Sequence, residues 1–382
     1  MIINRAVNIE RQIKPGKTLL IFGPRRVGKT TLLENFISQS KRKIVFYNGD
    51  NLSVQNKFSL PDIANLAPLV DGYEILVIDE AQNITNIGQS LKILNDQKRD
   101  LSIIATGSSS FTLSGQVGEP LVGRKTTLFL FPLSLEEILR NRTDKPMPII
   151  WEQMQEQLLI YGMYPNSVLA ENDSERRDFL WELTDSLLLK DILRFQEIKG
   201  SDFLLKLLRL LAFQIGSEVS LEELGKNLGI SKNTVSRYLD LLEKSYIIFR
   251  LSGYSRNLRN EIKKMPKYYF YDIGVRNAVI NNFNPLSMRD DIGKLWENFA
   301  LGERIKFCAY SQVRKNYYFW RTWEQQEIDL IEEAGDTLLA FEFKYSSVKP
   351  TAAPKKFRQA YPLANFEVIS SGNFVNFVTN TP

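Results

Sequence analysis

The sequence predicts an α/β protein whose first third is a parallel β-sheet covered by helices on both faces. Three observations lead to this prediction. Short apolar runs alternate with helical patterns between Lys17 and Phe131. The runs are continuously apolar, which is typical of strands buried on both faces of a parallel sheet. The first run leads into a loop bounded by glycines and then into a helix, which is the order of a phosphate-binding loop.

The composition limits the possible chemistry. The 382 residues include no histidine, which excludes Ser-His-Asp triads, Cys-His dyads and histidine-ligated metal sites. Hydrolytic chemistry must therefore use carboxylates, lysine, arginine, hydroxyls and metals held by oxygen. Lys and Arg outnumber Asp and Glu by 49 to 44, a mild excess that permits nucleic-acid binding without requiring it.

The sequence also bears on the compartment. Cys308 is the only cysteine, so an intrachain disulfide is excluded and a reducing compartment is favoured. No segment approaches the roughly 18 apolar residues of a membrane span. The first residues lack the apolar core of a signal peptide. We expect a cytoplasmic protein with no membrane partner.

Five apolar runs are the predicted strands of the parallel sheet: residues 18–23, 43–48, 74–79, 101–107 and 125–131. After Pro132 the pattern becomes helical. The helices expected there cover residues 135–139, 150–159 and 176–195. The stretch "YGMYP" (residues 161–165) separates the last two of these helices.

The loop "GPRRVGKT" (residues 23–30) has the spacing G-x-x-x-x-G-K-T. Its glycines allow successive N–H groups to point into one concavity, and the start of the next helix adds partial positive charge. We expect Lys29 to reach the β- and γ-phosphates of ATP and Thr30 to hold Mg²⁺. The predicted nucleotide-binding residues are Gly23, Pro24, Arg25, Arg26, Val27, Gly28, Lys29, Thr30, Thr31 and Asp79.

An acidic pair follows the third predicted strand, in "ILVIDEAQ" (residues 75–82). At the strand tip, Asp79 is suited to hold Mg²⁺ together with Thr30. The adjacent Glu80 is suited to polarise the attacking water, so we expect it to be catalytic. The next predicted strand ends in "ATGSSS", which places Thr106 or Ser108 to sense the γ-phosphate.

Residues 1 to about 200 resemble an AAA+ ATPase of the archaeal and bacterial family that carries "RRVGKTTL" and "DEAQ" motifs. The stretches "FPLSLEEIL" (residues 131–139) and "YGMYP" resemble that family's next two landmarks, although its break is more often Gly-Gly-x-Pro. The resemblance implies a homo-oligomer in which the nucleotide lies between subunits and a neighbour inserts an arginine. Arg124 is the candidate for that arginine, and the alternative is a pairing of Arg124 with a carboxylate in its own chain. Arg25 and Arg26 pair either across the subunit interface or with nearby acidic residues.

Residues 220–272 resemble a winged helix-turn-helix. "LGIS" supplies the turn, and Ser231 is placed to cap the second helix. The expected DNA contacts of that helix are Lys232, Asn233 and Arg237. The expected phosphate contacts of the wing and its flanks are Arg250, Tyr254, Arg256, Arg259, Lys263, Lys264 and Lys267. The alternative is a packing or oligomer contact with a solvated basic surface.

The C-terminal part resembles a PD-(D/E)XK nuclease-like domain. "EIDL" supplies Asp329, "FEFK" supplies Glu342 and Lys344, and the helix "KLWENFALGE" supplies Glu297. A strand period of two places Glu342 and Lys344 on one face. We expect Asp329 and Glu342 to hold Mg²⁺ or Mn²⁺, with Glu297 and Lys344 completing the catalytic set. The alternative is a degenerate scaffold that only binds.

The predicted organisation is a P-loop AAA+ core (1–132), a helical lid (133–200), a winged helix-turn-helix (201–285) and a restriction-endonuclease-like α/β domain (286–382). We expect an Mg²⁺-dependent ATPase that acts on DNA, with Glu80 and Arg124 as its catalytic residues and a metal-dependent nuclease at the C-terminal end. The alternative is an ATP-gated interaction switch whose C-terminal domain binds a partner without cleaving it.

Overall fold

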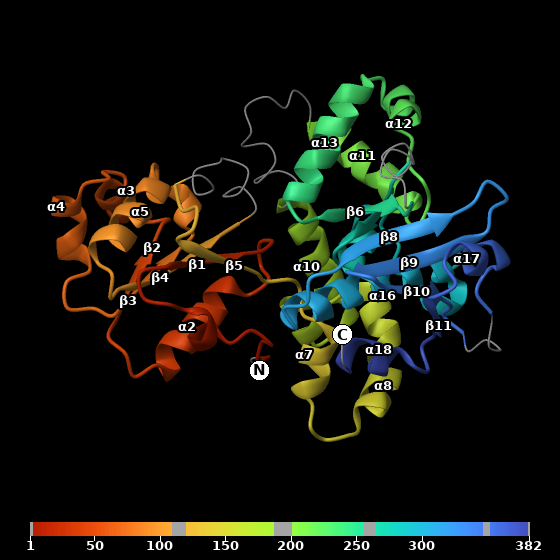
Figure 1. Cartoon of the computed structure of the whole chain (residues 1–382), viewed down its shortest axis with the longest axis horizontal. Coiled ribbons are helices and arrows are strands. Elements are labelled where there is room, and N and C mark those ends of the chain that lie inside the picture. The colour runs from red at the N-terminus through yellow and green to blue at the C-terminus, as the bar shows by residue number, and fades with distance from the viewer. Residues whose placement is uncertain (1–2, 109–119, 187–200, 256–264, 347–351, 381–382) are drawn as a thin grey trace.

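The computed structural model describes residues 3–108, 120–186, 201–255, 265–346 and 352–380 (Figure 1). Its first part is a five-stranded parallel sheet in the order β2-β3-β4-β1-β5. The strands are β1 (Thr18–Phe22), β2 (Ile44–Asn48), β3 (Ile75–Asp79), β4 (Ser102–Gly107) and β5 (Lys125–Phe129). All five predicted strands are confirmed, as is the mixed α/β class with a parallel core.

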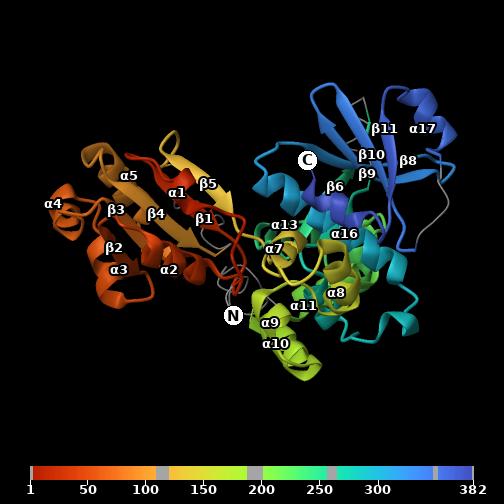
Figure 2. The same ribbon diagram turned by 90° about the horizontal axis from the view of Figure 1, so that it is seen from below.

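Helices cover both faces of this sheet (Figure 2). They are α1 (Ile9–Gln12), α2 (Lys29–Gln39), α3 (Leu52–Phe58), α4 (Ile63–Leu66) and α5 (Ile87–Gln97). Alternate residues of β1 enter two different hydrophobic clusters. Leu19 belongs to the cluster that contains Leu33 of α2, and Leu20 to the cluster that contains Leu91 of α5. This two-sided burial explains why the strands are continuously apolar in sequence.

The sheet order brings three strand ends together. β4 lies between β3 and β1, and all three run parallel. Their carboxyl ends therefore share one edge, which is where α/β sheets bind ligands. The phosphate loop, the acidic pair and the end of "ATGSSS" that the structure describes meet at this edge.

A helical region follows the sheet and contains α7 (Leu135–Arg140), α8 (Met147–Tyr161), α9 (Pro165–Leu169) and α10 (Asp173–Ser186). The "YGMYP" break lies between α8 and α9. Gly162 has a φ of 67°, and a Cβ on it would lie 2.1 Å from Oδ1 of Asp272. Oδ2 of the same carboxylate accepts a 2.7 Å hydrogen bond from the Met163 amide. The break therefore packs directly onto a segment more than a hundred residues away, which only glycine permits.

The next region begins with α11 (Ser201–Phe213), which the sequence did not predict. The order helix, turn, helix, strand, strand then appears as predicted. The elements are α12 (Leu221–Leu228), α13 (Lys232–Lys244), β6 (Ile248–Gly253) and β7 (Lys267–Phe270). Ser231 caps α13 by accepting the Thr234 amide at 3.2 Å, and β6 and β7 are antiparallel. The short α15 (Ile273–Val279) follows β7.

The β6–β7 pair continues into the C-terminal sheet. Its six strands have the order β11-β10-β9-β8-β6-β7, and β6 pairs in parallel with β8. The added strands are β8 (Asn316–Arg321), β9 (Glu327–Ala334), β10 (Thr337–Phe343) and β11 (Asn365–Ile369). The helices of this part are α16 (Ile292–Tyr310), α17 (Lys355–Ala360) and α18 (Phe374–Thr379). One sheet thus joins the β6–β7 pair of the middle region to the C-terminal strands.

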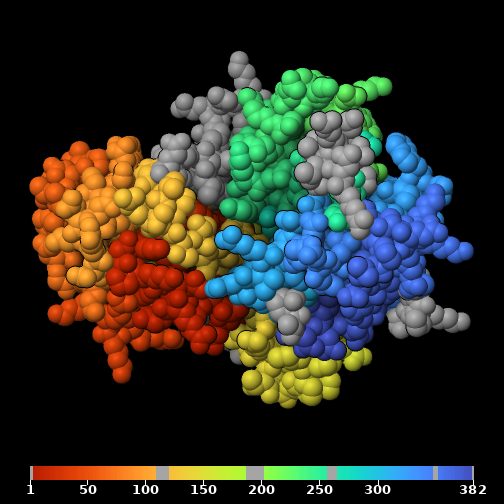
Figure 3. Space-filling view, viewed as in Figure 1, coloured from red at the N-terminus to blue at the C-terminus, as the bar shows by residue number. Residues whose placement is uncertain are grey.

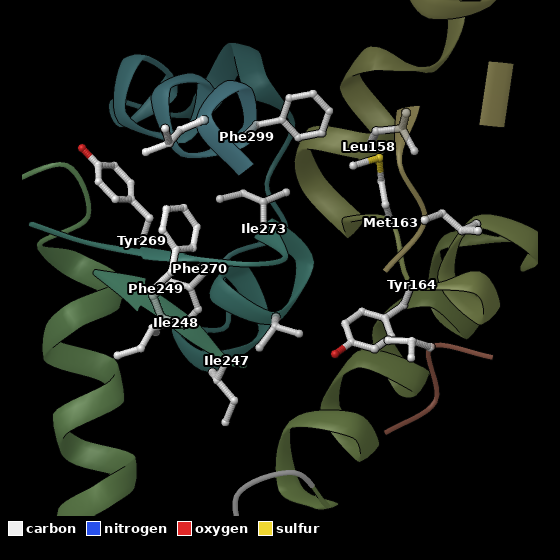
Figure 4. Packing of buried hydrophobic residues seen from close by; sticks show 14 of the residues in the cluster. Leu158, Met163, Tyr164, Ile247, Ile248, Phe249, Tyr269, Phe270, Ile273 and Phe299 are labelled. Carbon is white, nitrogen blue, oxygen red and sulfur yellow. The ribbon is translucent and has the colours of Figure 1, made fainter. Parts of the chain in front are cut away.

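One hydrophobic cluster connects these regions. Figure 4 shows Ile273 between Phe270 on one side and Met163 of the "YGMYP" break on the other, with Phe299 of α16 above. The space-filling view shows the parallel-sheet part as a lobe that adjoins the rest of the chain (Figure 3). At that boundary, side chains of α16 bind the backbone of Phe131, Leu133 and Leu135, which follow β5.

Candidate nucleotide-binding site

The phosphate loop encloses its own lysine. Lys29 is the first residue of α2, and Gly28 before it has a φ of 93°. The Lys29 side chain is buried, and its Nζ donates to the carbonyl oxygens of Gly23 and Pro24 at 3.0 Å each. Gly23 is confined by the next strand end, because a Cβ there would lie 2.2 Å from the Leu130 carbonyl oxygen. The loop therefore places a cation within a tight turn at a helix N-terminus, which suits phosphate binding.

The Asp79 carboxylate, at the tip of β3, accepts hydrogen bonds from two hydroxyl groups. Thr30 Oγ1 donates to its Oδ2 at 2.7 Å, and Thr106 Oγ1 donates to its Oδ1. Asp79 is only 2% exposed. The two hydroxyls come from the start of α2 and the end of β4. The structure therefore brings together Thr30 of the phosphate loop with Asp79 and Thr106, which lie at two different strand tips.

Glu80 lies beside this group in a left-handed backbone conformation, with a φ of 50°. Its amide donates to Thr106 Oγ1 at 3.0 Å, and its carboxylate accepts from the side-chain amide of Gln82. The side-chain oxygen of Gln82, Oε1, in turn accepts a hydrogen bond from the Ser108 amide at 3.3 Å. A left-handed non-glycine residue costs on the order of 1 kcal/mol or more and is common at functional sites. Gln82, which the sequence analysis did not assign, orients the predicted catalytic carboxylate.

The phosphate loop also contacts the helical region. Arg26, with a φ of 62°, pairs with the Glu182 carboxylate of α10, and its guanidinium lies 5.8 Å from the Phe179 ring centroid. Two pairings were expected for Arg26, across a subunit interface or with an acidic residue nearby. The structure shows the second, with an acidic residue of the same chain. Arg25 also lies in the loop and has interactions of its own.

Arg124 lies at the opposite edge of the sheet from its own phosphate loop. It directly precedes β5, and its carbonyl oxygen accepts the Thr18 amide at the start of β1. Its Nε donates to Oδ1 of Asp96 in α5 at 2.6 Å, and both side chains are more than one third exposed. Within one chain, Arg124 therefore has the carboxylate partner that the sequence analysis named as its alternative. The pair is exposed, so its contribution to stability is small.

Arg5 is a further residue at the base of the loop. Its side chain is 7% exposed, and its Nε donates to Glu137 Oε1 at 3.0 Å. Nη1 donates to the Val27 carbonyl oxygen at 2.7 Å, and Nη2 donates to the Phe131 carbonyl oxygen at 2.7 Å and to the Tyr310 hydroxyl at 3.0 Å. The sequence analysis missed Arg5, because no local motif surrounds it and its partners are distant in the chain.

A cavity of about 670 Å³ lies between residues 4–11 and the part of α2 that starts at Leu32. Leu32 in the first turn of α2 and Phe36 one turn later line one side. Backbone and side chains of the N-terminal segment line the other. Its volume is in the range of small-molecule sites.

The four predicted residues of the C-terminal site share one electrostatic environment. The β9–β10 register pairs Phe341 with Leu330, which places Glu342 beside Asp329. Oδ2 of Asp329 accepts the Phe343 amide at 2.8 Å, and Lys344 pairs with Glu342 at 2.7 Å. Burial, then the charges of Glu297 and Glu342, raise the pKa of Asp329 well above its usual value. Bringing the Asp329, Glu342 and Glu297 carboxylates together therefore costs free energy unless a cation binds or one of them is protonated.

A buried lysine already occupies the Glu297 side of this cluster. Lys267 of β7 is 1% exposed, and its Nζ lies 3.4 Å from Glu297 Oε1 and also contacts the Glu327 carboxylate. The hydroxyl of Tyr269 donates to the same Glu297 oxygen at 2.5 Å. A Cβ on Gly216, in the turn after α11, would lie 2.9 Å from Glu297 Oε2, so this turn covers the carboxylate. No three Asp, Glu or Cys side chains form a metal-holding group within the described ranges.

Two predicted phosphate contacts are wrong. Lys267 is buried among carboxylates, so its charge is not available to DNA. Tyr254 is 8% exposed, and its hydroxyl donates to Glu333 Oε1 at 3.2 Å within the C-terminal sheet. Both are withdrawn from the surface because the second sheet incorporates β6 and β7, which the sequence analysis treated as a free wing. Arg256, Arg259, Lys263 and Lys264 lie outside the described residues.

The predicted DNA-contacting residues of α13 lie on its exposed face. Lys232, Asn233 and Arg237 are exposed, whereas Val235, Tyr238 and Leu239 are buried. Lys232 pairs with Glu222 of α12 at 3.3 Å, which is an exposed and therefore weak pair. The polar face of α13 is thus presented to solvent in the single chain.

Comparison with protein families identifies three regions. Residues 15–139 match the model of an AAA domain, so this part of the chain is similar to AAA domains. Residues 152–286 and 292–379 match two different domains of unknown function. The AAA match includes the phosphate loop, the acidic pair and Arg124.

Similar proteins come from bacteria and archaea and are described as uncharacterized. One from Mycobacterium tuberculosis is 24% identical over 354 residues, which cover 91% of this chain and 75% of the relative. One from Haemophilus influenzae is 25% identical and covers 84% of this chain and 80% of the relative. One from Methanocaldococcus jannaschii is 26% identical, with coverages of 83% and 74%.

Among solved structures, the chain is similar to Cdc6p from Pyrobaculum aerophilum, at 13% identity and a TM-score of 0.23. That match covers 69% of this chain and 86% of the other. Across the helices that the structure describes, none combines the length and apolar character that a membrane span requires.

Proposed function

We propose that the protein is an Mg²⁺-dependent ATPase that binds ATP on the loop of residues 23–30. The observation that carries the proposal is the meeting of Lys29, Thr30, Asp79 and Glu80 at one sheet edge. The site fits Mg²⁺, because Thr30 and Asp79 present hard oxygen donors within 2.7 Å of each other and Asp79 is buried. When bound, the ion neutralises phosphate charge.

The chain's own residues have separate tasks in this proposal. Lys29 exchanges the carbonyl oxygens of Gly23 and Pro24 for phosphate oxygens and so binds the ground state. Glu80 positions the attacking water and accepts its proton. Gln82 donates a hydrogen bond to the Glu80 carboxylate, and Thr106 accepts one from the Glu80 amide, so both fix the position of Glu80. The cavity beside α2 accommodates the nucleoside, because it borders the first turn after Lys29 and Thr30.

The test separates nucleotide binding from turnover. Lys29→Ala is expected to weaken ATP binding by roughly 100-fold, because it removes a charged partner of the phosphates. Glu80→Gln is expected to retain binding and to lose most of the turnover. Calorimetry measures the affinity and phosphate release measures the rate. Normal turnover in Glu80→Gln would refute the assignment of Glu80.

DNA is the proposed partner, and the polar face of α13 is the proposed contact. Its support is the exposure of Lys232, Asn233 and Arg237 near the helix start. Cleavage of DNA at the C-terminal cluster is a second candidate function, supported by the convergence of Asp329, Glu342 and Lys344. Two carboxylates there fit Mg²⁺ or Mn²⁺, whereas Glu297 already has Lys267 and Tyr269 as partners. Those partners support the alternative, an ATP-gated switch whose C-terminal part only binds.

One set of assays distinguishes these candidates. Anisotropy with labelled duplex DNA is measured over a salt series, with Arg237→Glu as the variant and Lys206→Glu in α11 as the charge-matched control. Nicking of supercoiled DNA is measured over a Mn²⁺ titration, with Asp329→Ala and Lys344→Ala. Metal-dependent nicking that Asp329→Ala abolishes supports the nuclease. ATP-dependent DNA binding without nicking supports the switch, and no binding at low salt excludes DNA as the partner.

A further inference from the structure

Arg5, which lies outside every motif of the sequence, binds the backbone of the phosphate loop. The Arg5 guanidinium donates to the Val27 carbonyl oxygen at 2.7 Å, at the turn that precedes Lys29. A Cβ on Gly28 would lie 4.0 Å from Arg5 Nη1, so Arg5 faces the backbone of this turn directly. The remaining donors of the guanidinium are bound to Glu137, to the Phe131 carbonyl oxygen and to Tyr310. Arg5 therefore has little freedom to move independently of the loop.

The geometry of the peptide bond gives this contact a consequence for phosphate binding. The Val27 carbonyl and the Gly28 amide belong to one peptide unit, and the described chain has no cis peptide. In a trans peptide the C=O and N–H point in opposite directions. The bond from Arg5 to the carbonyl therefore directs the Gly28 N–H away from Arg5, toward the other side of the loop. Amides of this kind bind phosphate oxygens in glycine-rich loops.

The same guanidinium contacts the C-terminal half of the chain. The Tyr310 hydroxyl, at the end of α16, accepts from Arg5 at 3.0 Å and from the Phe131 amide at 3.1 Å. Two further α16 side chains hold the strand-to-helix connection next to it. Glu303 accepts the Leu135 amide at 2.6 Å, and Lys306 donates to the Leu133 carbonyl oxygen at 3.0 Å.

The other end of α16 carries the acidic cluster. Glu297 lies in its second turn and binds Lys267 of β7. A helix of 19 residues rises by roughly 28 Å and is stiff over that length. Buried polar contacts therefore connect the phosphate loop to the C-terminal sheet through Arg5, Tyr310 and α16.

We propose that Arg5 is a positioning residue of the ATP site: it orients the Gly28 amide toward the phosphates and, through Tyr310, couples the loop to α16. This inference rests on the proposed ATPase function. Nucleotide binding that tightens the loop strengthens the Arg5 bond to Tyr310, and loss of that bond weakens the response of α16 to nucleotide. The coupling supplies a route by which ATP acts on whatever the C-terminal part binds.

The test uses the full chain and three variants. Arg5→Met removes all the donors, and Arg5→Lys keeps the charge but not the planar fork. Tyr310→Phe leaves Arg5 intact and removes the hydroxyl that binds Arg5 and the Phe131 amide to α16. Arg140→Met is the control, because Arg140 is in α7 next to Glu137 but its side chain is 62% exposed. Thermal unfolding establishes that each variant is folded.

Affinity for ATP and the separate values of kcat and KM report on the positioning role. Arg5→Met is expected to weaken ATP binding roughly 10- to 100-fold, with Arg5→Lys in between and Arg140→Met unchanged. Wild-type affinity in a folded Arg5→Met variant would overturn the positioning role. A wild-type protein that binds no ATP would instead refute the proposed function, so the two failures are distinguishable.

Hydrogen exchange of the α16 amides, with and without a non-hydrolysable ATP analogue, reports on the coupling. In the wild type, the analogue is expected to slow exchange in the last two turns of α16. Tyr310→Phe is expected to bind the analogue within about threefold of wild type, because Arg5 keeps its bond to the Val27 carbonyl oxygen. It is expected to lose the slowing, because the hydrogen bonds of the hydroxyl with Arg5 and with the Phe131 amide are both missing. A response of α16 that persists unchanged in Tyr310→Phe would overturn the coupling.

Discussion

At the residue scale, the C-terminal cluster shows how a few buried charges determine one another's state. Burial acts to lower the pKa of Lys267, but Glu297 and Glu327 outweigh it, and the pKa is raised. Lys267 therefore stays charged and neutralises part of the acidic group. The Phe343 amide and Lys267 act to lower the pKa of Asp329, but burial, Glu297 and Glu342 outweigh them, and the pKa is raised well above its usual value. The ionised form of Asp329 thus reduces the stability of the folded chain.

This imbalance predicts that Asp329→Asn stabilises the chain in the absence of divalent metal. Asparagine retains an acceptor for the Phe343 amide and removes the repulsion. We expect an increase in the free energy of unfolding on the order of 1 kcal/mol at pH 7. Because the folded pKa is raised, the gain grows as pH rises through that pKa and disappears below the ordinary Asp value of about 3.9. Urea unfolding in EDTA at several pH values measures it.

Asp336→Asn is the matched control, because Asp336 is exposed in the turn between β9 and β10. It is expected to change stability by less than about 0.5 kcal/mol. A loss of stability in Asp329→Asn at pH 7 would contradict the repulsion. If Asp329 holds a metal, Mn²⁺ stabilises the wild type and not this variant, by mass action.

At the element scale, the junction of α8 and α9 depends on close backbone approach. Gly162 and Gly229 have nearly the same φ, at 67° and 68°. A Cβ on Gly162 would collide with Asp272, whereas one on Gly229 meets nothing within 4 Å. Their backbones also differ, since ψ is −163° at Gly162, in a region essentially restricted to glycine, and 29° at Gly229, in the left-handed helical region. The "YGMYP" break requires its glycine for both reasons, since it docks on the start of α15.

Gly162→Ala is therefore expected to destabilise the chain more than Gly229→Ala. The strain at Gly229 is worth about 1 kcal/mol. At Gly162 both the glycine-only backbone conformation and the displacement of Asp272 add to this, for a total of about 3 kcal/mol or more. Urea unfolding of both variants measures the difference. Equal losses would show that Asp272 moves aside without cost and would contradict a tight junction.

At the scale of the whole molecule, the position of Arg124 bears on assembly. It lies at the amino edge of the parallel sheet, away from its own phosphate loop, and is paired with Asp96 on the surface. Such a residue reaches an ATP site only if that site belongs to another copy. We retain the proposal that the chain forms a homo-oligomer in which Arg124 completes a neighbour's site.

Mixing of two inactive variants tests this proposal. Arg124→Ala alone and Glu80→Gln alone are each expected to lose about 10³-fold or more in turnover. If Arg124 acts on a neighbour, the mixture regains activity, because some interfaces pair an intact Arg124 with an intact Glu80. Asp96→Asn is the control, since it removes the partner of Arg124 within the chain and leaves the arginine in place. A mixture no more active than its components, after proven subunit exchange, would exclude the role.

The sequence by itself determined the parallel sheet, the phosphate loop and the order of helices and strands over most of the chain. Each of these is encoded locally: β1 by a continuous apolar run, the loop by the spacing of Gly23, Gly28 and Lys29, and α13 by a cap at Ser231 and an amphipathic pattern. The acidic pair after β3 and the Glu-x-Lys run in β10 were likewise visible, because the strand period places their side chains. The helices α9, α11, α15, α17 and α18 were not predicted.

Only the tertiary structure decided which side chains meet. Arg5 and Tyr310 are 305 residues apart, Arg26 and Glu182 are 156 apart, and Lys267 and Glu297 are 30 apart on different elements. No local period relates such pairs, since each depends on how separate elements pack. The incorporation of β6 and β7 into the C-terminal sheet had the same cause, and it buried Lys267 and Tyr254. The burial of a charge follows from that packing, because a lysine on a strand is exposed or buried according to what covers its face.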